Sequence, residues 1–81
     1  MQVTVYATTT CPYCQMLKSY LKEKGVSFEE KLVDQNEKDK DEMMKESDGY
    51  LGVPFTLVVK DNSEKVKIVG FDKMLFDKTL Q

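Results

Sequence analysis

Hydrophobic and polar residues alternate at the start of the chain and then change to a helical spacing. Gln2–Ala7 (QVTVYA) alternates and is rich in β-branched and aromatic side chains, which predicts a strand. Pro12 suits the first position of a helix, so we expect a helix that begins there, is capped by Cys11 and ends at Gly25. The apolar face of this helix is predicted to consist of Cys14, Leu17, Tyr20 and Leu21, widened by Tyr13 and Met16.

A second strand and a charged helix are expected next. Residues 26–33 have a weaker strand pattern, and a strand–helix–strand unit predicts that the first two strands are parallel. Residues 34–48 mix charges of both signs, which indicates a helix with a solvated face. We expect Asn36 to cap this helix and Gly49 to end it.

The last third of the chain predicts a β-hairpin followed by a helix. Phe55–Val59 and residues 64–69 are short apolar runs joined by a polar turn. Residues 71–80 have helical spacing, and the face expected to be buried consists of Phe71, Met74, Leu75 and Thr79. The order β-α-β-α-β-β-α predicts an α/β fold with a four-stranded mixed sheet and helices on both faces, in a single domain over residues 1–81.

Composition narrows the classes of function. The 81 residues include twelve basic residues, all of them lysine, and fourteen acidic residues, so the net charge is −2. Nucleic-acid binding usually needs a basic excess in which arginine is prominent, so we expect no nucleic-acid partner. No stretch reaches the roughly 18 apolar residues of a membrane span, and the first residues do not form a signal-peptide pattern. We therefore expect no membrane partner and a cytoplasmic location.

The chain has two cysteines, Cys11 and Cys14, and both lie in one predicted helical turn. As the N-cap, Cys11 would face unpaired backbone N–H groups and the positive end of the helix dipole, and both favour a thiolate. Cys14 would be close enough to attack a disulfide formed by Cys11. Histidine is absent, which excludes Cys–His activation and histidine metal ligands. The pair alone is compatible with redox chemistry, metal binding or a structural disulfide, although a bridge across so short a loop gains little chain entropy.

Three motifs, taken in order along the chain, resemble those of the glutaredoxins. Cys11-Pro12-Tyr13-Cys14 resembles the active-site signature of that family. Val53-Pro54 falls where the family has its cis-proline turn, and Gly70-Phe71-Asp72 falls where it has a glycine–aspartate turn. The resemblance covers essentially the whole chain. It implies a thioredoxin fold and a dithiol thiol–disulfide oxidoreductase that reduces protein disulfides or glutathione mixed disulfides.

The resemblance also implies roles for the residues in these motifs. Cys11 would be the nucleophile and Cys14 the resolving thiol that releases the reduced product. Tyr13 would contact the substrate from the edge of the motif. No tightly bound cofactor is implied, and the chain is expected to act as a monomer on protein substrates that contain disulfides.

The two later motifs would bind the substrate. Val53 and Pro54 would leave backbone groups free to pair with an extended substrate thiol. Gly70-Phe71-Asp72 would hold the γ-glutamyl end of glutathione on free N–H groups at the start of the last helix. A second interpretation, in which Asp72 is only the N-cap of that helix, explains an aspartate there equally well.

Three positions depart from the pattern of glutaredoxins that use glutathione. Those proteins usually have lysine where this chain has Thr8, threonine where it has Gly52, and glycine where it has Val69. Gly70-Phe71 also resembles small redoxins that are reduced by thioredoxin reductase and supply ribonucleotide reductase. Glutathione and thioredoxin reductase are therefore both candidate electron sources.

Metal binding is the main alternative from another class of function. Two cysteines supply half of a four-thiolate site, so an iron–sulfur or zinc module would need a dimer or two glutathione thiols to complete it. Pro12 stiffens the motif and disfavours this use. We expect no metal site within one chain.

Overall fold

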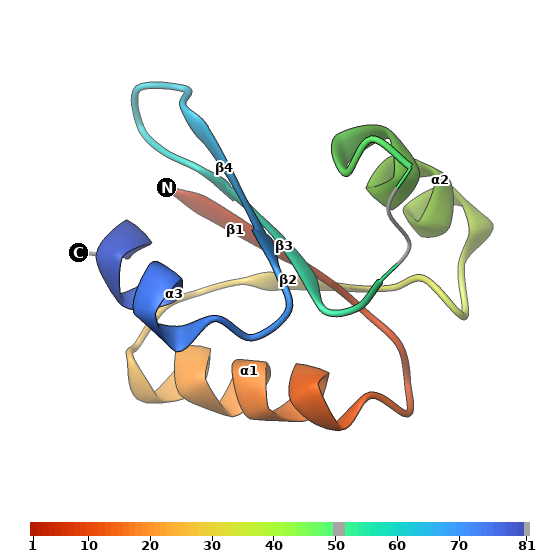
Figure 1. Ribbon diagram of the computed structural model, residues 1–81, viewed down its shortest axis with the longest axis horizontal. Helices are drawn as coiled ribbons and strands as arrows, with labels where there is room; N and C mark the ends of the chain where they lie inside the picture. The colour runs from red at the N-terminus through yellow and green to blue at the C-terminus, as the bar shows by residue number, and fades with distance from the viewer. Residues whose placement is uncertain (50–51, 81) are drawn as a thin grey trace.

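The computed structural model describes residues 1–49 and 52–80 of the chain, and Figure 1 shows how its elements are arranged. They follow in the order β1 (Gln2–Ala7), α1 (Pro12–Glu23), β2 (Glu29–Leu32), α2 (Glu37–Glu46), β3 (Phe55–Val59), β4 (Lys65–Val69) and α3 (Lys73–Thr79). This is the predicted order of strands and helices. None of the described helices is long and apolar enough to cross a membrane.

The four strands form one mixed sheet in the order β2-β1-β3-β4. β1 pairs in parallel with β2 and antiparallel with β3, and β3 pairs antiparallel with β4. α1 and α3 pack on one face of the sheet, and α2 packs on the other (Figure 1). The predicted parallel pair, the hairpin and the placement of helices on both faces are confirmed.

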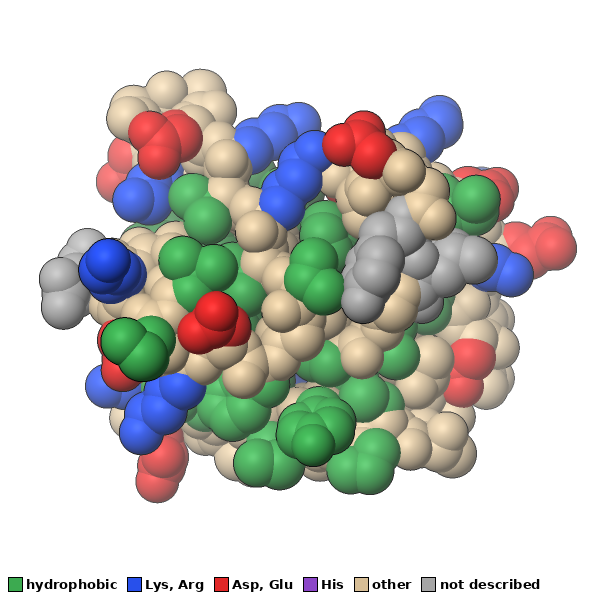
Figure 2. Space-filling view, viewed as in Figure 1, with side chains coloured by type: hydrophobic (Ala, Val, Ile, Leu, Met, Phe, Trp, Pro, Cys, Tyr) green, Lys and Arg blue, Asp and Glu red, His purple; other side chains and the backbone are tan. Residues whose placement is uncertain are grey.

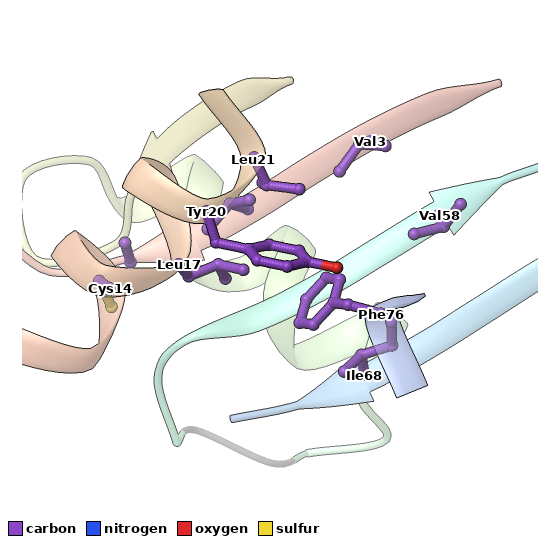
Figure 3. Packing of buried hydrophobic residues seen from close by; sticks show 10 residues of the cluster. Val3, Cys14, Leu17, Tyr20, Leu21, Val58, Ile68 and Phe76 are labelled. Carbon is purple, nitrogen blue, oxygen red and sulfur yellow. The ribbon is translucent and has the colours of Figure 1, made fainter. Parts of the chain in front are cut away.

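Two hydrophobic clusters fill the space between the sheet and its helices. Because successive strand residues point to opposite faces, β1 and β3 contribute to both clusters. The cluster under α2 is the smaller one and contains Tyr6, Met43, Phe55 and Leu57. The larger cluster, under α1 and α3, is shown in Figure 3 and contains Val3, Val5, Ala7, Cys14, Leu17, Tyr20, Leu21, Val58, Ile68 and Phe76.

The helix boundaries follow from residues that satisfy the free backbone groups at each end. The Asn36 Oδ1 atom accepts the N–H groups of Lys38 and Asp39 at 2.9 and 3.3 Å, so Asn36 caps α2 as predicted. Gly25 follows α1 with a φ of +70°, a conformation that glycine adopts with little strain. The chain then turns away from the helix, and the Val26 N–H donates to the Leu21 carbonyl at 3.0 Å.

Three predicted boundaries or faces are wrong. The second strand extends over Glu29–Leu32 and not over residues 26–33, because its register pairs it only with the segment of β1 from Thr4 to Ala7. α2 ends at Glu46 with Ser47 as its C-cap, before Gly49. Tyr13 and Met16 do not widen the buried face of α1. Their side chains are 63% and 52% exposed.

The buried face of α3 also differs from the prediction. The helix begins at Lys73, after the cap at Asp72, so Phe71 lies outside it. Phe76 and Thr79 are buried, whereas Met74 and Leu75 are 81% and 37% exposed. This seven-residue helix covers the sheet with one stripe of side chains. Phe76, Thr79 and Leu80 supply that stripe at the spacing i, i+3 and i+4.

Polar contacts hold the helices on both faces in place. Under α2, the Tyr6 hydroxyl donates to the Glu42 Oε1 atom at 2.8 Å, and the Lys31 Nζ atom donates to the same oxygen at 2.7 Å. The hydrogen bond from Lys31 holds the pKa of Glu42 below its usual range, and Tyr6 adds to this effect. Between α1 and α3, the Tyr20 hydroxyl donates to Asp77, and burial raises the pKa of Tyr20 to about 12.

We predict that Phe76→Ala destabilises the protein strongly and that Met74→Ala does not. Phe76 is fully buried in the larger cluster, so its truncation should leave a cavity and cost about 3–5 kcal/mol. Met74 is the matched control on the same helix, because 81% of its surface is exposed. Urea denaturation monitored by circular dichroism measures both changes. Similar losses for the two variants would contradict the described orientation of α3.

Candidate active site

Cys11 lies where the loop after β1 enters α1. It is the N-cap of the helix, with an extended backbone (φ −93°, ψ 111°), and Pro12 occupies the first helical position. The Cys14 N–H donates to the Cys11 Sγ atom at 3.2 Å. This bond and the positive end of the helix dipole both stabilise negative charge on sulfur. Cys11 is therefore a partly exposed sulfur that accepts a backbone hydrogen bond at the start of α1.

Cys14 lies one helical turn further on and has no exposed surface. Burial, supported by the neighbouring Cys11 thiol, raises the pKa of Cys14 to about 12. Cys14 therefore stays a neutral thiol near pH 7, one helical turn from the partly exposed sulfur of Cys11. Both cysteines are free in the structure.

A side-chain contact fixes the loop before Cys11. The Thr9 N–H and Oγ1 groups donate to the Asp34 Oδ2 atom at 3.1 and 2.7 Å, and these bonds lower the pKa of Asp34. Neither residue of this pair stands out in the sequence. The predicted parallel pairing of β1 and β2 could have indicated the contact, because it brings the residues that follow the two strands to the same end of the sheet.

The second motif lies next to the third. The Val53–Pro54 peptide bond is cis, as expected, and Pro54 is buried. The Gly70 N–H donates to the Pro54 carbonyl at 2.8 Å, and Gly70 has a φ of +75°. Val53 and Cys11 both pack at the edge of the larger cluster. The fold therefore brings residues 53–54 and 70–72 together at the end of the sheet where α1 begins.

The third motif, Gly70-Phe71-Asp72, leads into α3. The Asp72 Oδ1 atom accepts the Leu75 N–H at 3.2 Å, so Asp72 is the N-cap of α3. The Phe71 ring packs edge-on against Tyr20, with ring centroids 5.5 Å apart. The capping interpretation of Asp72 is confirmed. Glutathione binding at this turn stays a prediction.

One further predicted contact residue and the three positions that differ from the usual glutaredoxin pattern lie within or just before the three motifs in the sequence. Tyr13 is exposed on the first turn of α1, and Thr8 is half-buried in the loop before Cys11. Gly52 precedes the cis peptide bond, and Val69 is 51% exposed at the end of β4. No lysine takes the place of Thr8 in the sequence between β1 and α1.

The described part of the chain offers no complete metal site. Over residues 1–49 and 52–80, no group of three or more His, Cys, Asp or Glu side chains is placed to hold a metal ion. Cys11 and Cys14 therefore have no third ligand of these types beside them. The iron–sulfur or zinc alternative is not favoured.

A two-cysteine motif at a helix N-terminus, beside a strand–helix–strand unit, is typical of thioredoxin-like redox proteins. The fold and the site together define a thiol–disulfide oxidoreductase. The glutaredoxin family model matches residues 3–63, and the chain belongs to the glutaredoxin family.

Two relatives and two solved structures show the extent of the similarity. An uncharacterized glutaredoxin-like 8.6 kDa protein from the rubredoxin operon of Clostridium pasteurianum is 35% identical over 79 residues, covering 98% of this chain and 97% of that protein. Glutaredoxin 3 of Escherichia coli is 47% identical over 52 residues, covering 64% of this chain and 61% of glutaredoxin 3.

The glutaredoxin structure from Archaeoglobus fulgidus matches with a TM-score of 0.78 at 26% identity, over 99% of this chain and 86% of that one. A mutant of a thioredoxin-like protein matches with a TM-score of 0.83 at 25% identity, over 99% of this chain and 100% of that one. The predicted thioredoxin fold is confirmed.

We predict that Cys14 reacts slowly with iodoacetamide in a Cys11→Ser variant and that its rate keeps rising with pH. Because the pKa of Cys14 is raised to about 12, its thiolate fraction is small at neutral pH. That fraction should increase about tenfold per pH unit, without a plateau near the free-cysteine pKa of about 8.5. Mass spectrometry of the alkylated protein measures the rate. The Cys14→Ser variant is the control and should react faster at pH 7, while a plateau below pH 9 for Cys14 would contradict its burial.

Proposed function

We propose that the chain reduces disulfides by a dithiol mechanism in which Cys11 attacks and Cys14 resolves. The Cys11 thiolate bonds to one sulfur of the substrate disulfide, and the other sulfur leaves as a thiolate that takes up a proton. The observation that carries this proposal is the contrast between the two sulfurs. Cys11 is partly exposed and accepts the Cys14 N–H, while Cys14 is buried with a raised pKa.

The second step needs Cys14 to lose its proton only after the mixed disulfide has formed. Cys14 then attacks the Cys11 Sγ atom, the substrate leaves as its second thiolate, and that thiolate takes up a proton. The products are a reduced substrate and a Cys11–Cys14 disulfide, so two electrons pass from the protein to the substrate. The raised pKa of Cys14 supports attack by Cys11 first and by Cys14 second, because Cys14 is a neutral and weakly nucleophilic thiol when the substrate arrives.

We propose that the substrate lies across the ends of the two later motifs. Backbone groups of Val53, beside the cis-proline, would pair with an extended segment around the substrate cysteine. Tyr13 would contact the same segment from α1, where its ring is exposed. The hydrogen bond between Gly70 and Pro54 supports a single binding surface, because it fixes the two loops next to each other.

We propose glutathione as the source of electrons. We also propose that the protein is located in the cytoplasm, where thiols are kept reduced. Membership of the glutaredoxin family supports glutathione. Its γ-glutamyl carboxylate would bind the N–H groups of Phe71 and Asp72, while the Asp72 side chain also caps α3. Thr8 removes one cation from the expected set of contacts. We therefore propose weaker glutathione binding than in members that have lysine there.

The roles of the two cysteines are tested with single serine variants. Cys11→Ser should lose disulfide reductase activity by at least about a thousandfold, because the attacking sulfur is gone. Cys14→Ser should accumulate a mixed disulfide on Cys11, since the resolving thiol is missing. Turnover assays and intact-mass spectrometry measure the two outcomes. An active Cys11→Ser variant, or an adduct that fails to form on Cys14→Ser, would refute the assignment.

The electron source is tested by comparing turnover with two reducing systems. A variant that adds a positive charge at position 8 is a second test. We expect turnover with glutathione and glutathione reductase to exceed turnover with thioredoxin reductase. Thr8→Lys should lower the KM for glutathione severalfold, about the effect of one added ion pair in a partly exposed site. Thr10→Lys, in the same loop, is the matched control and should change the KM little. Faster turnover with thioredoxin reductase would instead identify that enzyme as the donor.

A further inference from the structure

The first turns of α1 carry apolar side chains that face outward next to Cys11. Tyr13 and Met16 are 63% and 52% exposed, although their spacing would suit a buried face. Figure 2 shows hydrophobic side chains gathered on the surface over α1, along the lower edge of the view. Contiguous exposed apolar groups of this kind mark sites of interaction.

A groove continues this apolar surface along α1. It has a volume of about 460 Å³ and lies between the outward side of α1 and the segment that leads into α3. Met16 and Ser19 line it from α1, and Phe71 lines it from the opposite side. Tyr20 also contributes, and its ring meets that of Phe71 edge-on at an interplanar angle of 62°. We call this feature the α1–α3 groove.

The walls of the groove suit a side chain of a polypeptide better than a small charged ligand. Methionine and aromatic walls adapt to apolar groups of different shape. At the rim, Glu23 and Lys73 carry opposite charges, so the groove has no single-sign field for an anion or a cation. Gln15 and Ser19 add groups that can hydrogen-bond to a peptide backbone.

The groove also lies within reach of a polypeptide bound at Cys11. Along the axis of α1, Met16 and Ser19 lie about 8 to 12 Å from Cys11, since a helix rises about 1.5 Å per residue. An extended chain advances about 3.3 Å per residue. A substrate segment that is held by its cysteine at Cys11 and runs along α1 would reach the groove about two to four residues away from that cysteine.

We propose that the α1–α3 groove binds a bulky apolar side chain of the substrate protein, at a position two to four residues from its disulfide cysteine, about the span given by the helix rise. This inference rests on the proposed function, because it requires attack by Cys11. It predicts that the protein prefers protein substrates with an apolar residue near the disulfide. The groove shares Phe71 with the third motif of the proposed site, so one bound segment would contact both.

Two glutathionylated hexapeptides test the groove. One has leucine three residues from its cysteine, and the other has serine at the same position. Because burial of a leucine side chain changes binding substantially, the wild type should favour the leucine peptide about tenfold in kcat/KM. Met16→Glu should reduce this ratio to about one, since a carboxylate in the groove disfavours an apolar occupant.

The control variant is Met44→Glu, which makes the same change on α2, across the sheet. Met44 is 39% exposed, and its substitution should leave the ratio unchanged. The ratio compares two peptides on one protein, so a general loss of activity cancels. Equal rates for the two peptides with the wild type, or an unchanged ratio in Met16→Glu, would overturn the groove alone. A wild type that reduces neither peptide would refute the proposed function.

Discussion

The burial of one stripe of α1 is the constraint on which the rest of the structure depends. Cys14, Leu17 and Leu21 form that stripe and pack against the centre of the sheet. The same packing fixes the rotation of α1 about its axis. This rotation places one cysteine in the core and leaves the other at the N-terminus of the helix. Cys14 belongs to the core, and Cys11 lies at the helix terminus, where its sulfur accepts the Cys14 N–H. The difference between the two thiols thus follows from the attachment of the helix.

The surroundings of Cys11 depend on hydrogen bonds between loops that are far apart in the sequence. Asp34 accepts the Thr9 N–H in the loop before Cys11. The Pro54 carbonyl accepts the Gly70 N–H and so joins the loop before β3 to the loop after β4. These loops follow or precede strands of one sheet, so the sheet sets their separation. The loops around Cys11 can therefore keep a fixed arrangement through these hydrogen bonds. The register of the paired strands sets the relative positions of these loops.

Much of the fold followed from local patterns, whereas the missed features depend on tertiary contacts. The cap at Cys11, the stop at Gly25 and the alternation of β1 each depend on neighbours in the sequence, and each was predicted correctly. Phe76 was missed because a short helix with several apolar residues has more than one plausible buried face.

Within the site, the cis peptide bond at Val53–Pro54 was expected from the family motif, and the cap at Asp72 was one of two interpretations of that residue. The Thr9–Asp34 pair was not expected, since neither residue is unusual in sequence. The exposure of Met16 was also missed, because its spacing fits the buried stripe of α1. Only the packed structure shows that the stripe is already filled. The features that depend on two distant segments were therefore the ones that the sequence left open.

The central place of β1 in the sheet has a consequence for how the chain folds. β1 contains Gln2–Ala7, yet its antiparallel partner is Phe55–Val59, so this pairing joins the beginning of the chain to its second half. Such a contact closes a long loop, which costs chain entropy and slows folding relative to local pairing. During synthesis on a ribosome, the cysteine motif emerges well before the strand that completes its support. The reactive pair is therefore made early, and its finished environment is assembled late.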